Sequence, residues 1–165
     1  MRAVKISLCT LVLAAAGVFA VFTVGLRRKS PLVLGVIRRF NRAYVNPRQR
    51  DAGTPGAYAS IIQHVGRATG TSYATPIVAS GTEDGFVIAL PYGSQADWLK
   101  NVLAAGSATI LHEGRSDAVE RPELVPIAAA DAYFSRGDRR AHRVFGTDQC
   151  LRVRRVDDDR SAAAG

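Results

Sequence analysis

Residues 66–70, Gly-Arg-Ala-Thr-Gly, have the residue types and spacing best suited to binding an anion. Two glycines bracket a basic and a hydroxyl residue in what is expected to be a turn between two strands. Successive backbone N–H groups in such a turn can form an anion-binding concavity, and Arg67 can add a bidentate contact to a phosphate. The alternative is a plain hairpin with an exposed arginine.

A second segment with the same potential follows at residues 91–101. It begins with Pro-Tyr-Gly-Ser, which reads as a strand end and a glycine turn, and Asp97 can then open a helix that contains Trp98 and Asn101. The free N–H groups at the start of a helix also favour an anion. The alternative places Trp98 in the core and leaves Asn101 on a solvated helix face.

Other catalytic motifs are absent from the sequence. It contains no P-loop, GxGxxG, GxSxG or HExxH motif. The histidines are scattered in sequence without a partner at ligand spacing, so no metal site is predicted at His64, His112 or His142. Cys9 and Cys150 are expected to be apolar fillers and not a disulfide pair.

The elements that must position these residues belong to one predicted domain over residues 51–156. Strands are predicted at residues 57–65, 72–80, 86–90, 109–112, 116–121 and 150–156. A helix is expected from Asp97 to a C-terminal Gly106, and one or two short helices over 128–145 with a break near Gly137. Six short strands joined mainly by hairpins predict an α+β fold, a small β-barrel with helices outside it, before a frayed tail at 157–165.

In this order and spacing, the two segments resemble the deazaflavin (coenzyme F420)-dependent nitroreductase and quinone reductase family of actinobacteria. The shared pattern is a Gly-Arg-x-Thr-Gly turn, a Thr-Pro in the next strand, a glycine turn, and Trp-x-x-Asn in a helix that precedes a strand. It covers about residues 57–125 and, more loosely, 139–154. The resemblance implies a flavin-reductase-like split β-barrel with peripheral helices, which agrees with the predicted strands.

The resemblance also assigns roles to residues. It implies that the phosphate tail of the coenzyme is held by Arg67, Thr69 and the backbone of Gly66 and Gly70. It further implies that Pro76 shapes the pocket wall and that the coenzyme groove is lined by Tyr92, Gly93, Trp98 and Asn101. The available proton donors are Tyr92, Tyr133 and His142, and the sequence does not choose among them.

The activity implied is that of an oxidoreductase that uses reduced F420 to transfer hydride to a quinone, a nitro compound or another lipophilic acceptor. Such an enzyme must place the reduced ring against the acceptor and supply a proton. A non-catalytic split barrel that binds a lipid or fatty acid stays open as the alternative, and a split barrel that binds FMN or haem is a poorer one. Split barrels of this kind are often dimers, so a homodimer is considered as well.

The positive charge of the chain is concentrated at its N-terminus. Ten of the 22 basic residues and none of the 14 acidic ones lie in residues 1–50, so the remaining 12 basic residues leave the domain a formal charge of −2. A nucleic-acid-binding module normally carries its basic surface on the folded domain itself. The sequence therefore predicts no nucleic-acid partner.

The basic residues at the N-terminus flank a hydrophobic run. Residues 6–26 contain no charged side chain, and a helix of that length spans about 32 Å, against a hydrocarbon core of about 30 Å. This predicts a transmembrane anchor over residues 1–29 with the lipid bilayer as a partner, while a cleaved secretory signal is the alternative. The basic residues after the run predict a single-pass protein of the plasma membrane with a cytoplasmic domain. Residues 30–50 are then a basic juxtamembrane segment with a short interfacial helix over 31–45.

Overall fold

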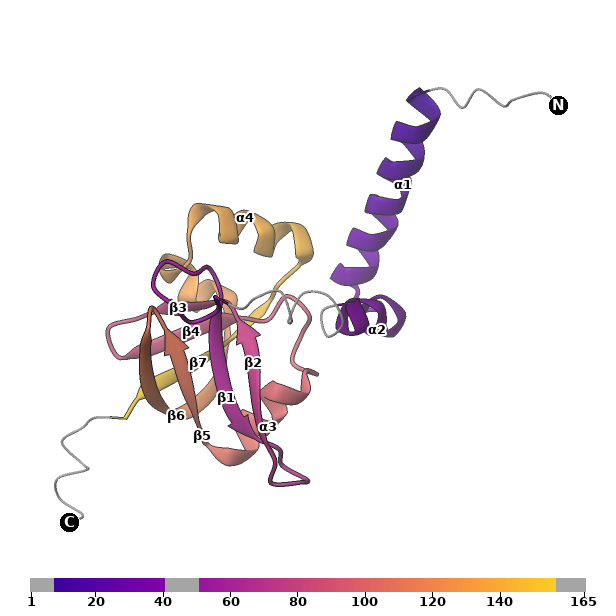
Figure 1. Cartoon of the computed structure of the whole chain (residues 1–165). Coiled ribbons are helices and arrows are strands. Elements are labelled where there is room, and N and C mark those ends of the chain that lie inside the picture. The colour runs from indigo at the N-terminus through magenta and orange to yellow at the C-terminus, as the bar shows by residue number, and fades with distance from the viewer. Residues whose placement is uncertain (1–7, 41–50, 157–165) are drawn as a thin grey trace, which may run out of the picture.

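The computed structural model describes residues 8–40 and 51–156 (Figure 1). The described helices are α1 (Leu8–Arg27), α2 (Pro31–Phe40), α3 (Asp97–Ala105), the 3-10 helix η3 (Ile127–Tyr133) and α4 (Arg136–Phe145). The strands are β1 (Ser60–Val65), β2 (Ser72–Ile77), β3 (Ala79–Gly81), β4 (Gly85–Ala89), β5 (Ser107–His112), β6 (Arg115–Pro126) and β7 (Gln149–Arg155). The predicted tail at 157–165 and the parts of the N-terminal predictions that fall on residues 1–7 and 41–50 lie outside the described residues.

The strands form one antiparallel sheet in the order β2-β1-β5-β6-β7-β4-β3. Its two edge strands, β2 and β3, are joined by Val78 alone, so the sheet must curl until its edges approach each other (Figure 1). The fold is thus α+β with a curled half-barrel. Seven strands replace the six predicted, because the segment predicted as one strand over 72–80 pairs with β1 up to Ile77 and with β4 from Ala79.

The main core fills the interior of the curled sheet. Phe86, Ile62, Ile110 and Leu151 are fully buried there together with Leu99 of α3. The predicted helix from Asp97 is confirmed as α3, which ends where Gly106 takes a φ of 73° and donates its N–H to the carbonyl of Val102. The core therefore fixes one face of α3, and with it the position of the Trp98 and Asn101 side chains.

A second apolar cluster covers the outer face of the sheet beneath η3. Cys150 lies in it with Val87, Ala130 and Phe134, and its thiol is free. Burial raises the pKa of this thiol to about 11, against a smaller opposing effect of Arg152. A protonated, buried thiol agrees with the apolar filler predicted at this position.

The helical segment before β7 breaks earlier than predicted. η3 and α4 are separated at Phe134 and Ser135, and Gly137 lies inside α4. The reason is the Ser135 side chain, which accepts the N–H of Asp138 and so starts a new helix. This cap places Asp138 and His142 on successive turns of α4.

The predicted membrane anchor is wrong. In residues 8–40 and 51–156, no helix combines the length and the apolar character that crossing a bilayer requires. The predicted plasma-membrane location and cytoplasmic orientation rested on that anchor and are wrong with it. Leu26, counted in the apolar run, is 2% exposed and packs with Leu34 and Ile37 of α2 and with Phe145 of α4. The end of α1 is therefore part of the domain's packing, not a free span.

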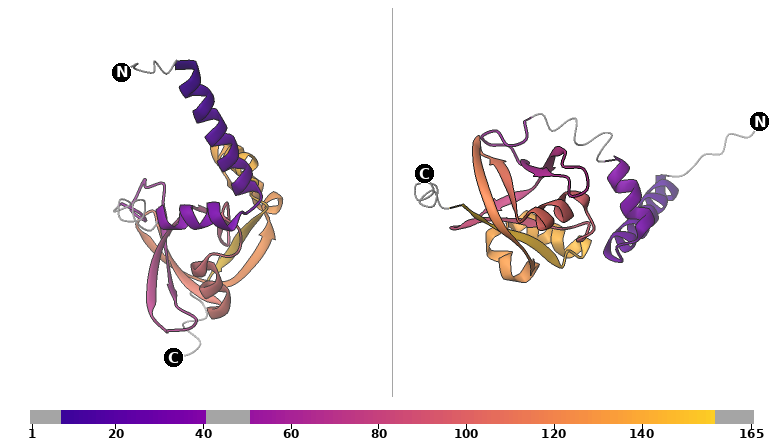
Figure 2. Two further views of the ribbon diagram at one scale, coloured as in Figure 1. Left: turned by 90° about the vertical axis from the view of Figure 1, so that its right-hand side faces the viewer. Right: turned by 90° about the horizontal axis from the view of Figure 1, so that it is seen from below.

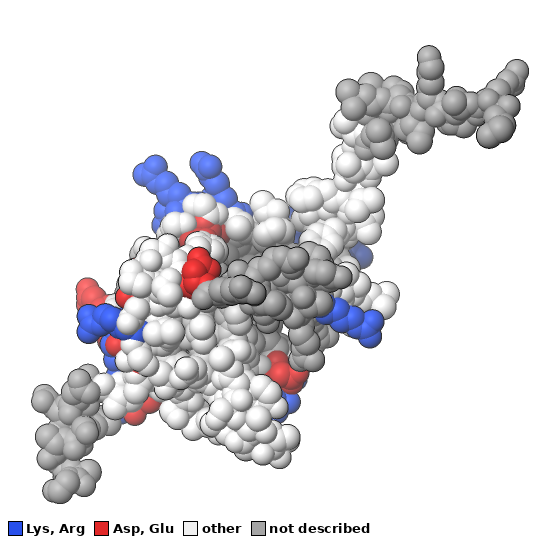
Figure 3. All heavy atoms as spheres, in the orientation of Figure 1, with Lys and Arg blue, Asp and Glu red and all other residues white. Residues whose placement is uncertain are grey.

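The α1–α2 elbow, residues 26–37, lies at one side of the half-barrel, and α1 extends away from the sheet (Figures 1 and 2). A Cβ on Gly25 would lie 2.6 Å from Cγ2 of Val33, so the two helices approach closely at their junction. A helix is present in the segment predicted to be an interfacial helix over 31–45, as α2, which is described up to Phe40. On the face drawn in Figure 3, basic and acidic side chains of the domain are interspersed.

Candidate functional site

The first of two neighbouring cavities has a volume of about 870 Å³ and is bordered by the 66–70 turn and the start of α3. Five of the predicted binding residues line this polar cavity: Gly66, Arg67, Thr69, Trp98 and Asn101. The predicted proximity of the turn to the Trp-x-x-Asn segment is therefore present in the structure.

Arg67 donates four hydrogen bonds to α3. Its Nη1 donates to Asn101 Oδ1 at 2.7 Å and to the carbonyl of Asp97 at 3.4 Å, its backbone N–H donates to Asn101 Oδ1 at 3.2 Å, and its Nη2 donates to Asp97 Oδ1 at 3.1 Å. The Arg67 side chain is 41% exposed and that of Asp97 is 78% exposed. The guanidinium thus has a fixed direction and a solvent-accessible partner at the mouth of the polar cavity.

The backbone of the 66–70 turn is largely satisfied within the protein. The N–H groups of Gly66 and Gly70 donate to Thr71 O and Gly66 O, both at 2.8 Å, and that of Thr69 donates to Gly66 O at 3.3 Å. The φ of Gly70 is 68°, in the left-handed region that favours glycine. The N–H groups envisaged from the sequence as an anion-binding concavity are therefore largely used by the turn itself. Anion binding here depends mainly on side chains, and the arginines among the described residues that line the cavity are Arg67 and Arg39.

His64 continues the network behind Arg67. Asn101 Nδ2 lies 3.2 Å from His64 Nδ1, and His64 Nε2 lies 3.1 Å from Thr75 Oγ1. Because Asn101 Oδ1 accepts from Arg67, its amide nitrogen must donate to Nδ1, and the proton of a neutral His64 must be on Nε2. Burial lowers the pKa of His64, which favours this neutral form. No role was predicted for His64, although it shares the buried face of β1 with Ser60 and Ile62.

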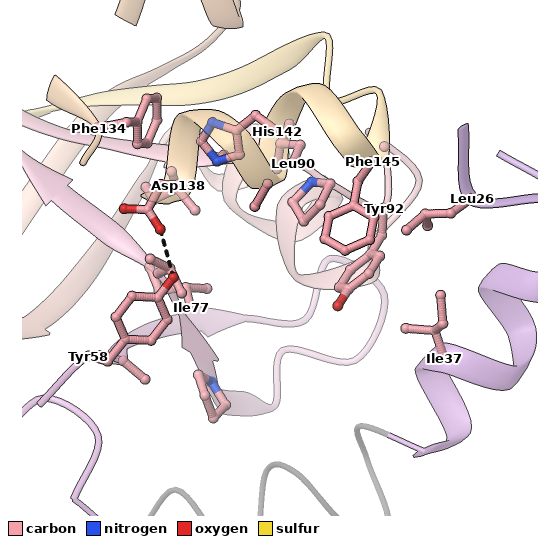
Figure 4. Close-up of a pocket in the computed structure, with 18 of the residues that line it drawn as sticks. Leu26, Ile37, Tyr58, Ile77, Leu90, Tyr92, Phe134, Asp138, His142 and Phe145 are labelled. Carbon is pink, nitrogen blue, oxygen red and sulfur yellow. Dashed lines mark hydrogen bonds between the residues drawn. The ribbon is translucent and has the colours of Figure 1, made fainter. Parts of the chain in front are cut away.

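The second cavity is apolar and has a volume of about 590 Å³ (Figure 4). Strand residues such as Ile77 and Ile88 form one wall, and Phe134 and Phe145 form another. The α1–α2 elbow closes a further side with Leu26, Val36 and Ile37, and Phe22, from the preceding turn of α1, lines the cavity as well. Trp98 lines this cavity too, so it is common to both.

The remaining predicted site residues divide between this cavity and the surface. Pro76, Tyr92, Gly93 and His142 line the apolar cavity. Tyr133 lies on η3, is 43% exposed, and is not among the described residues that line either cavity. The two glycine turns therefore serve different cavities that meet at Trp98, and of the three candidate proton donors only Tyr92 and His142 reach the apolar cavity.

A polar cluster at the edge of the apolar cavity was missed by the sequence reading. Tyr58 Oη donates to Asp138 Oδ1 at 2.9 Å (Figure 4). Ser135 Oγ donates to the other carboxylate oxygen, Asp138 Oδ2, at 2.6 Å. The rings of His142 and Phe134 pack edge-on, with their centroids 4.8 Å apart. The buried Nδ1 of His142 has no hydrogen-bond partner among the described residues. The local signal was the Ser-x-x-Asp helix start with a histidine four residues later, but nothing in the sequence linked it to Tyr58.

The ionisation of this cluster follows from its contacts. Burial opposes the charge on Asp138, but the hydrogen bonds from Ser135 and Tyr58 and the attraction of His142 outweigh it and lower its pKa. Partial desolvation, the hydrogen bond to Asp138 and the charge of that carboxylate raise the pKa of Tyr58 to about 12, although the residue as a whole is 71% exposed. Burial lowers the pKa of His142 although Asp138 and Asp131 oppose this. At neutral pH the cluster therefore holds a carboxylate, a phenol and a neutral imidazole.

Lys29 fastens the α1–α2 elbow to the domain. Its ammonium donates to the carbonyl oxygens of Pro91 at 3.4 Å and Gly146 at 3.3 Å, and it lies 3.8 Å from Asp148 Oδ1. Pro91 lines the apolar cavity, and Gly146 directly follows Phe145, which lines it too. The wall that the elbow contributes is thus tied to the two loops beside the cavity.

Comparisons with known proteins give structural similarities without a family. No family model matches the chain, and no curated protein matches it. One solved structure is 16% identical over 70% of this chain and 83% of its own length, with a TM-score of 0.45. The protein Atu2129 from Agrobacterium tumefaciens str. C58, described as of unknown function, is 13% identical over 72% of this chain and 56% of its own length, also with a TM-score of 0.45.

Proposed function

We propose that this chain is a reductase that uses the reduced deazaflavin coenzyme F420 to transfer hydride to a lipophilic acceptor. The observation that carries the proposal is that Trp98 lines both cavities. A polar cavity with Arg67 at its mouth thereby adjoins an apolar cavity with room for a small molecule. The resemblance over residues 57–125 supports the same assignment, and the half-barrel is then a split β-barrel of the flavin-reductase type.

The polar cavity fits an anionic coenzyme tail through Arg67. The ion pair between Arg67 and Asp97 is exposed, and pairs of this kind contribute only about 0.2–1 kcal/mol. A phosphate can therefore replace Asp97 on the guanidinium at small cost, while Asn101 continues to orient it. The Thr69 hydroxyl, which also lines the cavity, is a second donor to the same group.

The apolar cavity supplies the conditions for hydride transfer. When bound, the coenzyme supplies the hydride, and the chain must orient the acceptor, exclude water and deliver a proton. The apolar walls from the sheet, α4 and the α1–α2 elbow exclude water. Tyr92 Oη and a ring nitrogen of neutral His142 are the proposed proton donors, because both side chains line this cavity.

The test is a titration of the full chain with F420, followed by the fluorescence of the coenzyme. Saturation at or below tens of micromolar is expected. The Arg67→Ala variant should bind about 10- to 100-fold more weakly, the loss typical of a charge-assisted hydrogen bond. The matched control is Arg115→Ala, an exposed arginine in the β5–β6 hairpin outside both cavities, which should leave the affinity unchanged. Absence of saturation, or equal affinity in the Arg67 variant, would contradict the proposal.

A second candidate is non-catalytic binding of an apolar ligand. It is favoured by the mostly apolar lining of the second cavity and by the fact that Arg67 already has a carboxylate partner. Organic extraction of the purified full chain and mass spectrometry of the extract test it. A stoichiometric lipid in the extract, with no binding of F420, would favour this function over the reductase.

A further inference from the structure

The apolar cavity carries a single formally charged side chain. Among the described residues that line it, Asp138 is the only Asp, Glu, Lys or Arg. His142 also lines this cavity, and burial lowers its pKa, so its imidazole is neutral at neutral pH. The polar edge of this cavity is therefore anionic.

Among residues 8–40 and 51–156, no lysine or arginine forms an ion pair with Asp138. The ammonium of Lys29 is taken up by the carbonyls of Pro91 and Gly146 and by Asp148. On α4, Arg139 contacts Asp131, and the Nε of Arg143 donates to the carbonyl of Arg139. Within the part of the chain that the structure describes, the side chains that donate hydrogen bonds to the Asp138 carboxylate are two hydroxyl groups, those of Tyr58 and Ser135.

These partners leave the carboxylate able to accept more hydrogen bonds. Tyr58 uses one position on Oδ1 and Ser135 uses one on Oδ2, whereas a carboxylate offers about four acceptor positions. An ionised carboxylate has no proton to donate. A ligand group at this edge of the cavity must therefore donate a hydrogen bond or carry positive charge.

We propose that the apolar cavity selects a lipophilic molecule whose polar end donates a hydrogen bond to Asp138, as an alcohol or ammonium group does, and rejects the same apolar chain ending in a carboxylate. The inference rests on the proposed function only in taking this cavity as the acceptor site. A carboxylate beside Asp138 would place two like charges in a site of low polarity, which costs more than it does in water. Selection by charge then acts in addition to the apolar fit.

The test uses the full chain and three probes with the same ten-carbon chain: decanol, decylamine and decanoate. Trp98 is the only tryptophan and lines the cavity, so its intrinsic fluorescence reports binding without a label. Decanol and decylamine should bind at least about tenfold more tightly than decanoate at pH 7. No coenzyme is present, so a failure here is distinct from a failure to bind F420.

Three variants establish the origin of the preference. Asp138→Asn should bring the affinities for decylamine and decanoate to within about twofold of each other. Asp131→Asn removes an equal charge that acts on His142 but lies outside the lining of this cavity, and it should preserve the preference. Tyr58→Phe removes a hydroxyl and keeps the charge, so it should preserve the preference too. Equal affinity for decanoate and decanol in the unmodified chain, or an unchanged preference in Asp138→Asn, would overturn the inference.

Discussion

The side-chain amide nitrogen of Asn101 donates to Nδ1 of His64 over 3.2 Å, and both residues are 6% exposed. The amide oxygen of Asn101 accepts from Arg67 on the opposite side, at 2.7 Å. One buried amide therefore links the guanidinium at the mouth of the polar cavity to the imidazole behind it. Both sides of the amide must be satisfied at once, so this link fixes the direction of Arg67.

Replacement of Asn101 by alanine should destabilise the fold. It removes the acceptor of two Arg67 donors and leaves Nδ1 of His64 buried without a partner. A buried polar atom left unsatisfied costs about 1–3 kcal/mol, and a decrease of that size is expected in the free energy of unfolding measured with urea. Lys100→Ala, a change at the neighbouring position of α3, should alter it by less than about 0.5 kcal/mol. Equal effects of the two changes would remove the structural role assigned to Asn101.

Stability should decrease as the pH is lowered below about 6.5. Burial holds the pKa of His64 and of His142 below the ordinary value in the folded chain. Between the folded and unfolded pKa values the unfolded chain binds more protons, so the free energy of unfolding falls as the pH falls through that interval. The effect of Asp84 and Asp138, whose pKa values are also lowered, appears only below the ordinary carboxylate pKa of about 4.

The same experiment with His64→Gln isolates one histidine. Urea unfolding is measured in steps of about half a pH unit between pH 5 and pH 7. The free energy of unfolding should depend less steeply on pH in the variant, and the pH dependence that remains is due to His142. If the free energy of unfolding of the variant depends on pH as steeply as that of the unmodified chain, then His64 has the same pKa in the folded and the unfolded chain.

Local patterns predicted the elements that depend on neighbouring residues. The turn at Glu113 and Gly114 and the left-handed end of α3 at Gly106 follow from residue types at adjacent positions. The proximity of Arg67 to Asn101 could also be predicted, because the resemblance implies that both residues contact the same coenzyme. Two features could not be anticipated, because each joins segments at least 62 residues apart: the hydrogen bond between Tyr58 and Asp138, and the contacts of Lys29 with the domain. The apolar run before Arg27 shows the same difficulty, because hydropathy does not reveal that Leu26 packs on the domain.

Lys29→Met should release the α1–α2 elbow from the domain. The change keeps the apolar stem and removes the ammonium that contacts the carbonyls of Pro91 and Gly146. Hydrogen exchange should become faster for the amides of α2, for example that of Leu34, which donates to Ser30 O at 2.9 Å. Arg28→Met is the matched control, since Arg28 is the exposed neighbour, and it should leave the exchange rate unchanged. Equal rates in the two variants would show that Lys29 does not hold the elbow.

Gly85 is required where β4 approaches β7. A Cβ at this position would collide with the carbonyl oxygen of Val153 and lie 2.8 Å from Cα of Arg154, and both atoms belong to the backbone of the paired strand. Because a backbone cannot turn away as a flexible side chain can, Gly85→Ala must displace β7 within the sheet. Overpacking of this kind costs about 1–3 kcal/mol, to be measured as a lower midpoint in thermal and urea unfolding.

Gly81→Ala is the matched control. Gly81 lies four residues earlier, in β3, and no atom lies within 4 Å of a Cβ added there, so this change should alter the free energy of unfolding by less than about 0.5 kcal/mol. The pair separates the close approach of the strands from the general effect of adding a methyl group to a strand glycine, and similar losses in both variants would contradict the register of β4 on β7.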